Sequence, residues 1–81
     1  MWRREPVVAG SFYPSNSDRL SRDIDQYLSD ARGDRLDGNI FAVISPHAGY
    51  IYSGPVAAYS FRELKDRDIE LAVVIAPSHR A

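Results

Sequence analysis

Two segments of the chain are apolar at every position, residues 40–44 (IFAVI) and residues 71–76 (LAVVIA). Pro46 follows the first of them after one serine, and Pro77 follows the second directly. An uninterrupted apolar run of this length is typical of a strand that is covered on both faces, as in a parallel sheet with helices above and below. We therefore predict two buried strands, each of which ends at its proline.

Two other segments have helical periodicity. Apolar residues between 17 and 32 recur at the spacing of one helix face, and Ser15, Asn16 and Ser17 precede them as candidate N-caps. Residues 55–65 carry a broad apolar stripe, and Pro55 suits the first turn of a helix. We predict helices over residues 17–32 and 55–65. Residues 33–39, which contain two glycines, should end the first helix and turn the chain at the surface.

The order strand, helix, strand predicts a βαβ unit. The expected fold class is α/β, with a parallel or mixed sheet and flanking helices. Residues 6–14, which lie between two prolines, predict a short extended segment or edge strand, and residues 10–14 (GSFYP) have the composition of a turn. Two central strands cannot close their own edges, and a chain of 81 residues builds only a thin core. We interpret residues 1–81 as an N-terminal fragment of one larger α/β domain.

Composition and charge exclude several classes of function. The chain is 44% hydrophobic and 26% charged, which is typical of a folded soluble protein, and its net charge of −1 offers no basic surface for nucleic acid. No apolar run approaches the roughly 20 residues of a membrane span, and the N-terminus lacks the apolar region of a secretory signal. We expect a cytoplasmic protein with no nucleic-acid or membrane partner, whose exposed strand edges make the fragment self-associate.

The two histidines of the chain, His47 and His79, both follow a predicted strand and its proline. Ligands of open α/β sheets bind beyond the carboxyl ends of the strands, where neighbouring strands are about 4.8 Å apart. Imidazole is a common ligand of iron, copper and zinc and also transfers protons near neutral pH. We predict that His47 and His79 converge on one site. The alternative is that each merely caps a strand end by bonding a loop carbonyl.

The loop between His47 and Gly54 is rich in glycine and hydroxyl groups. Tyr50, Tyr52 and Ser53 are candidate substrate-binding residues, and backbone amides near residues 53–56 are candidates for holding an anion. The alternative is a rigid loop whose tyrosines pack on neighbouring helices. Phosphate-binding glycine motifs and a GxSxG elbow are both missing, so nucleotide binding and serine hydrolysis are disfavoured.

Three segments, VVAGSFYP (residues 7–14), PHAGYIYSGPVAA (46–58) and VVIAPSH (73–79), together resemble the Memo family, which includes the AmmeMemoRadiSam system protein B group. The resemblance implies an α/β fold similar to that of class III extradiol dioxygenases, with a metal pocket at the sheet edge. It also implies that His47 and His79 are metal ligands for iron(II) or copper, and that at least one further ligand lies beyond residue 81. Ala76 departs from the glycine that usually precedes PSH in the family, which affects the loop geometry rather than the ligands.

Two hypotheses of function follow. In the first, the intact protein is a metal-dependent oxidoreductase of the dioxygenase type, and the fragment by itself is inactive. In the second, the same pocket captures a peptide or an anion without turnover. The substrate and the physiological metal stay open.

Overall fold

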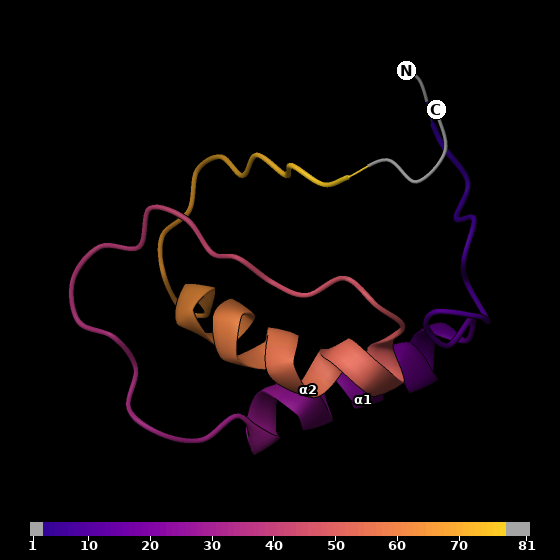
Figure 1. Cartoon of the computed structure of the whole chain (residues 1–81), viewed down its shortest axis with the longest axis horizontal. Coiled ribbons are helices and arrows are strands. Elements are labelled where there is room, and N and C mark those ends of the chain that lie inside the picture. The colour runs from indigo at the N-terminus through magenta and orange to yellow at the C-terminus, as the bar shows by residue number, and fades with distance from the viewer. Residues whose placement is uncertain (1–2, 78–81) are drawn as a thin grey trace.

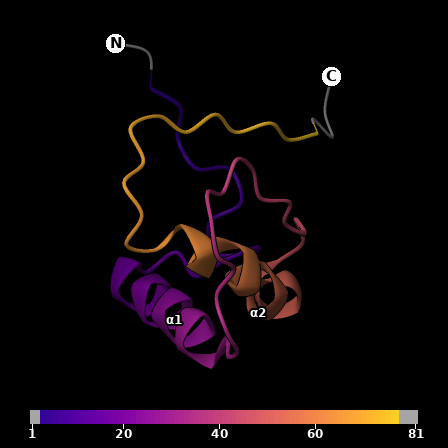
Figure 2. The ribbon, with the colours of Figure 1, turned by 90° about the vertical axis from the view of Figure 1, so that its left-hand side faces the viewer.

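The computed structural model describes residues 3–77, in which two α-helices pack side by side and one long segment connects them (Figures 1 and 2). Helix α1 is Ser17–Asp30 and helix α2 is Tyr50–Phe61. A short 3₁₀ helix, η1, continues α2 over Arg62–Leu64. Both predicted helices are therefore confirmed, although their ends differ from the prediction.

Helix α1 begins directly after a polar N-cap residue, Asn16. The side chain of Asn16 accepts a hydrogen bond of 2.9 Å from the backbone N–H of Arg19, which makes Asn16 the N-cap. The helix ends at Asp30, two residues before the predicted end. Gly33 has a φ of +108°, and it turns the chain into the surface connection that the glycines predicted.

The predicted start of the second helix at Pro55 is wrong, because α2 already begins at Tyr50 and contains Pro55 inside it. Pro55 lies in the second turn of α2, where its missing N–H leaves the Ile51 carbonyl without the usual intrahelical partner. The first turn forms upstream because the hydroxyl of Ser53 bonds to the backbone at Ala48 and Gly49. Local hydrogen bonding therefore outweighs the preference of proline for the first position.

Helices α1 and α2 are in close contact at Gly54. A Cβ atom added to Gly54 would lie only 2.6 Å from Cε2 of Tyr27. Glycine is required here because the ring of Tyr27 occupies the space of a side chain. This contact fixes the distance between the two helices.

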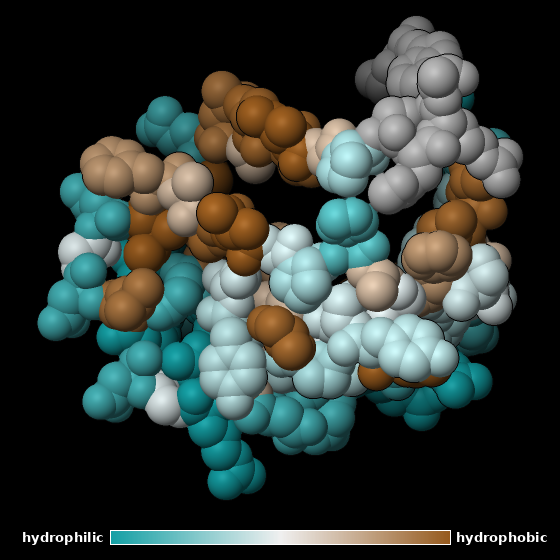
Figure 3. Space-filling view, viewed as in Figure 1, coloured by the Kyte–Doolittle hydropathy of each residue, from teal (hydrophilic) through white to brown (hydrophobic). Residues whose placement is uncertain are grey.

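The segments at residues 40–44 and 71–76 run without regular structure, and no strand occurs within residues 3–77. Their side chains are largely exposed, with Phe41 98%, Ile44 93% and Ile75 93% accessible. Figure 3 shows hydrophobic side chains along the upper edge of the molecule, where residues 71–76 run. The α/β fold stays a prediction, because the described residues contain no partner strand for either segment.

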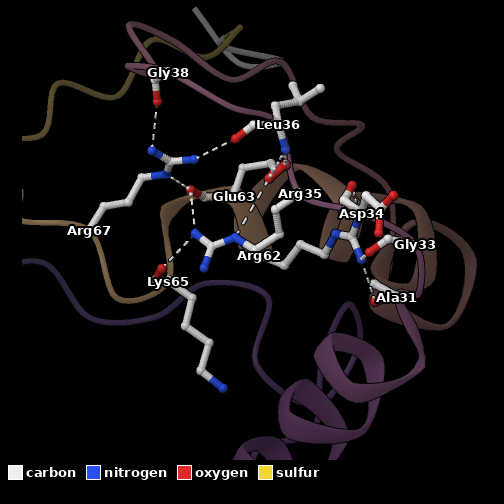
Figure 4. Close-up of polar contacts among 10 residues, drawn as sticks. All are labelled: Ala31, Gly33, Asp34, Arg35, Leu36, Gly38, Arg62, Glu63, Lys65 and Arg67. Atoms are coloured by element: carbon white, nitrogen blue, oxygen red, sulfur yellow. Dashed lines mark hydrogen bonds and ion pairs between the residues drawn. The ribbon is translucent and has the colours of Figure 1, made fainter.

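Residues 31–38 are held against the end of α2 by three arginines, Arg35, Arg62 and Arg67, which we call the arginine clamp (Figure 4). Arg62 donates to the carbonyls of Ala31, Gly33 and Asp34. Arg35 donates to the carbonyls of Glu63 and Lys65, and Arg67 donates to those of Leu36, Gly38 and Glu63. The guanidinium group suits this task because it presents five donors in a rigid plane.

Glu63 completes the clamp from η1. It is the only buried charged residue among residues 3–77, with 7% of its surface exposed, and its carboxylate accepts a 2.7 Å hydrogen bond from the Leu36 N–H. Nε of Arg35 lies 3.8 Å from the same carboxylate. A buried carboxylate needs such partners, so Glu63 and the clamp fix the connection between the helices.

The chain is less compact than a closed domain of its size. Its radius of gyration is 14.1 Å, whereas a compact domain of this length has about 12 Å. It exposes 7514 Å², whereas a folded monomer of this mass exposes about 4,900 Å². The excess surface includes the apolar segments described above.

Candidate functional site

His47 lies in the short connection between the apolar segment 40–44 and the start of α2. The hydroxyl of Ser60 donates a 2.9 Å hydrogen bond to the Ile44 carbonyl, which ties this segment to α2. The residue His47 itself is exposed at the surface. Its predicted partner, His79, lies outside the described residues.

The GSFYP segment is a turn, as predicted, and it contacts the start of α2. Gly10 has a φ of +89°, and its N–H donates a 2.7 Å hydrogen bond to the Tyr13 carbonyl. The N–H of Tyr50, the first residue of α2, donates to the Phe12 carbonyl at 2.7 Å. Two segments that the sequence separates by almost 40 residues therefore form one surface.

An open groove of about 340 Å³ lies where this turn, α1 and the start of α2 meet. The groove combines aromatic rings with one cation and one carboxylate. Its lining consists of Gly10, Ser11, Phe12, Tyr13, Pro14, Arg19, Asp23, Tyr27, Gly49, Tyr50, Ile51 and Tyr52. Small-molecule and peptide sites have this mixture of apolar walls and a few polar groups.

The two tyrosines predicted to bind substrate have different surroundings. The ring of Tyr50 packs against that of Tyr13, with centroids 5.3 Å apart and planes inclined by 39°. Tyr52 is 77% exposed. Both line the groove, so Tyr52 is the more accessible of the two hydroxyl-bearing residues and Tyr50 belongs to its packed wall.

Ser53, the third residue predicted to bind substrate, is buried, with 7% of its surface exposed. Its Oγ accepts from the Ala48 N–H at 3.2 Å and donates to the Ala48 carbonyl at 2.9 Å, with the Gly49 carbonyl at 3.2 Å as a second acceptor. These bonds engage its single proton. The geometry gives Ser53 the task of fixing the loop that carries His47.

The backbone amides suggested as an anion site are also engaged. Because α2 begins at Tyr50, residues 53–56 lie inside the helix, where the Ser53 N–H donates to the Gly49 carbonyl at 3.0 Å. Pro55 has no N–H to offer. The expectation that amides near residues 53–56 form an open helix start is therefore wrong.

Sequence reasoning did not bring α1 into the site. The periodicity of residues 17–32 predicts a helix but does not indicate that Arg19, Asp23 and Tyr27 line a groove, as they do in the structure. The GSFYP composition predicted a turn at residues 10–14, but it did not indicate that the turn lines the groove. The contribution of α1 depends on the packing of Tyr27 against Gly54, which no local pattern reveals.

Within residues 3–77, no three residues among His, Cys, Asp and Glu gather closely enough to hold a metal ion. A metal site that includes His47 would therefore need ligands outside this part of the chain. Neither described helix has the length and apolar character that crossing a membrane requires.

The comparisons with known proteins agree with the motifs. The sequence model of the Memo-like protein family matches residues 4–81, which is almost the whole chain. The chain belongs to this family. No solved structure matches it significantly.

Curated relatives carry the name MEMO1 family protein. The chain is 41% identical to one from Nitrosopumilus maritimus over 80 residues, covering 94% of this chain and 29% of the relative. It is 44% identical to one from Thermotoga maritima over 87 residues, which cover 95% of this chain and 31% of the relative. The relative from Thermoplasma acidophilum is 37% identical over 78 residues, which cover 96% of this chain and 28% of the relative. The chain thus spans less than a third of the length of these relatives.

Proposed function

We propose that the chain is the N-terminal piece of a Memo-like metal-binding protein that acts, when intact, as a non-haem iron- or copper-dependent oxidoreductase of the dioxygenase type. The observation that carries this proposal is the setting of His47, an exposed residue in the loop that leads to the groove residues Gly49, Tyr50 and Tyr52. Membership of the Memo-like family supports it.

The donor chemistry of the chain fits such a metal. His47 and His79 would supply two imidazoles, which suit iron(II) and copper, and at least one further ligand would come from beyond residue 81. When bound, the metal supplies a Lewis-acidic centre with open positions for oxygen or substrate. The bonds of Ser53 to Ala48 and of Ser60 to Ile44 hold the backbone on both sides of His47, which supports its use as a ligand.

The other residues of the site would bind and orient the substrate. Tyr52 offers an exposed hydroxyl as a hydrogen-bond donor. The inclined rings of Tyr50 and Tyr13 would form an apolar wall on one side of the substrate. Ser53 holds the loop and has no proton left for the substrate.

Metal analysis of the intact protein tests this function. His47→Ala and His79→Ala should each remove most of the bound iron or copper, because every lost ligand is replaced by water. Tyr52→Phe is the control, which should keep the metal. Unchanged metal content in both histidine variants would refute the proposal.

A second function is favoured by the groove itself: a non-catalytic module that binds a peptide or an anion. The groove pairs aromatic rings with Arg19 and Asp23, which together match the side chains and charges of a peptide. Titration of the metal-free intact protein with peptides, or with inorganic phosphate for an anion, distinguishes the two functions. Binding that requires the metal would contradict a purely scaffolding role.

A further inference from the structure

The connection between the helices contains an Asp-Gly pair, Asp37 and Gly38, in an unusually open position. Both residues are exposed, and a Cβ atom on Gly38 would meet nothing within 4 Å. Gly38 has a φ of +90°, and its N–H donates no hydrogen bond to any other described residue. The amide nitrogen of Gly38 is therefore accessible to the carboxyl group of the residue before it.

We infer that Asp37 is a site of spontaneous isoaspartate formation, and that Arg67 of the arginine clamp controls its rate. The nitrogen of Gly38 attacks Cγ of the protonated Asp37 carboxyl group. The N–Cγ bond forms, the Cγ–OH bond breaks, and the hydroxyl leaves with the amide proton as water. The product is a five-membered succinimide ring that joins the two residues.

Water then opens this ring at either of its carbonyl carbons. Addition at Cγ restores aspartate. Addition at the main-chain carbonyl carbon gives isoaspartate, in which the backbone runs through the side-chain methylene and the former main-chain carbonyl becomes the free carboxylate. No oxidant or enzyme is needed, and the final mass equals the initial mass.

Arg67 restrains this reaction because it holds the carbonyls on both sides of Asp37. Its guanidinium donates to the Gly38 carbonyl at 2.9 Å and to the Leu36 carbonyl at 3.1 Å. Ring closure requires the Asp37–Gly38 peptide to rotate toward Cγ, which moves the Gly38 carbonyl away from Arg67. The planar fork of arginine therefore opposes the reactive conformation.

Isoaspartate would in turn release this part of the connection. One extra main-chain atom between Leu36 and Gly38 changes the separation of the two carbonyls that a single rigid guanidinium now binds. The Leu36 N–H, which donates to buried Glu63, lies next to the altered residue. The modification would thus loosen the clamp where the connection meets η1.

Prolonged incubation of the intact protein at physiological temperature tests the inference. A protease that cleaves before aspartate but not before isoaspartate should progressively lose its cleavage at residue 37, with no change of peptide mass. Asp34 lies in the same connection but precedes Arg35, so its cleavage should persist as an internal control. Equal persistence at Asp37 and Asp34 would overturn the inference.

Two clamp variants test the role of Arg67. Arg67→Ala should accelerate the loss at Asp37 several-fold, and Arg67→Lys should have an intermediate rate, since one ammonium group cannot hold both carbonyls in the same plane. Arg62→Ala is the matched control, because Arg62 binds residues 31–34 instead. An acceleration by Arg62→Ala equal to that by Arg67→Ala, or none in either Arg67 variant, would refute control by Arg67.

Discussion

At the residue scale, Gly54 has the least room for a side chain among the glycines of the described chain. A Cβ atom there would lie 2.6, 2.9 and 3.1 Å from three ring atoms of Tyr27. Alanine in place of a helical glycine usually stabilises by up to about 1 kcal/mol, but overpacking costs about 1–3 kcal/mol. We expect Gly54→Ala to lower the free energy of unfolding of the intact protein by about 1–2 kcal/mol in denaturant titration.

Gly49→Ala is the matched control for this prediction. Gly49 has a φ of −56°, and the nearest atoms to an added Cβ lie 3.7 Å away, at ordinary contact distance. Its substitution should leave the stability nearly unchanged. A Gly54→Ala variant as stable as Gly49→Ala would contradict the close approach of the two helices.

Ser53 offers a second prediction, on the role of its hydroxyl. Ser53→Ala should lower the free energy of unfolding by about 1 kcal/mol, because the N–H of Ala48 loses its acceptor in a part-buried hydrogen bond. Metal and ligand affinity of the folded protein should change little. A large loss of ligand affinity at unchanged stability would instead assign Ser53 to substrate binding.

The residues of the candidate site were partly predictable from the sequence. His47, Tyr50 and Tyr52 follow from one local motif, and the structure places both tyrosines in the groove. The contributions of Tyr13 and Tyr27 follow from contacts between distant segments. Sequence periodicity reports which face of a helix packs but not which residue it packs against.

At the element scale, the starts of α1 and α2 differ in how far they depend on neighbouring residues alone. The N-cap of α1 was predictable because Ser15, Asn16 and Ser17 all suit that position, and Asn16 takes it. The start of α2 was not, since proline is favoured at the first position of helices in general. Here the Ser53 hydroxyl and the docked turn stabilise an earlier first turn.

The capping of α1 gives a third prediction. Asn16→Ala should lower the stability by about 1 kcal/mol, because the Arg19 N–H loses its side-chain acceptor. Asn16→Asp keeps an acceptor and adds a charge that the helix dipole favours, so it should stay close to the natural protein. Thermal unfolding followed by circular dichroism measures both, and equal losses in the two variants would contradict the cap.

The two predicted strands, unlike the N-cap of α1, depend on contacts outside their own segments. Their apolar pattern indicates burial on both faces, yet Phe41 and Ile75 are almost fully exposed within the described part of the chain. A ladder forms only when a partner strand is present, and strand pairing in parallel sheets is non-local. The prediction of a sheet therefore concerns the larger domain and stays a prediction.

At the scale of the whole molecule, the open apolar surface predicts self-association of residues 1–81 when they are prepared alone. Exposed apolar patches and unpaired extended backbone form a template for another chain. Helix α2 contributes, since Ile51 and Val56 are 75% and 60% exposed on its surface. Light scattering should detect oligomers at moderate concentration, and a stable monomer would contradict this expectation.

The central claim is that His47 and His79 bind the same metal ion in the intact protein. Pulsed electron paramagnetic resonance of the copper(II)-loaded protein tests it most directly, because the remote nitrogen of each bound imidazole modulates the signal. We predict modulation from two imidazoles, falling to one in His47→Ala and in His79→Ala. Modulation that is unchanged in both variants would contradict the claim.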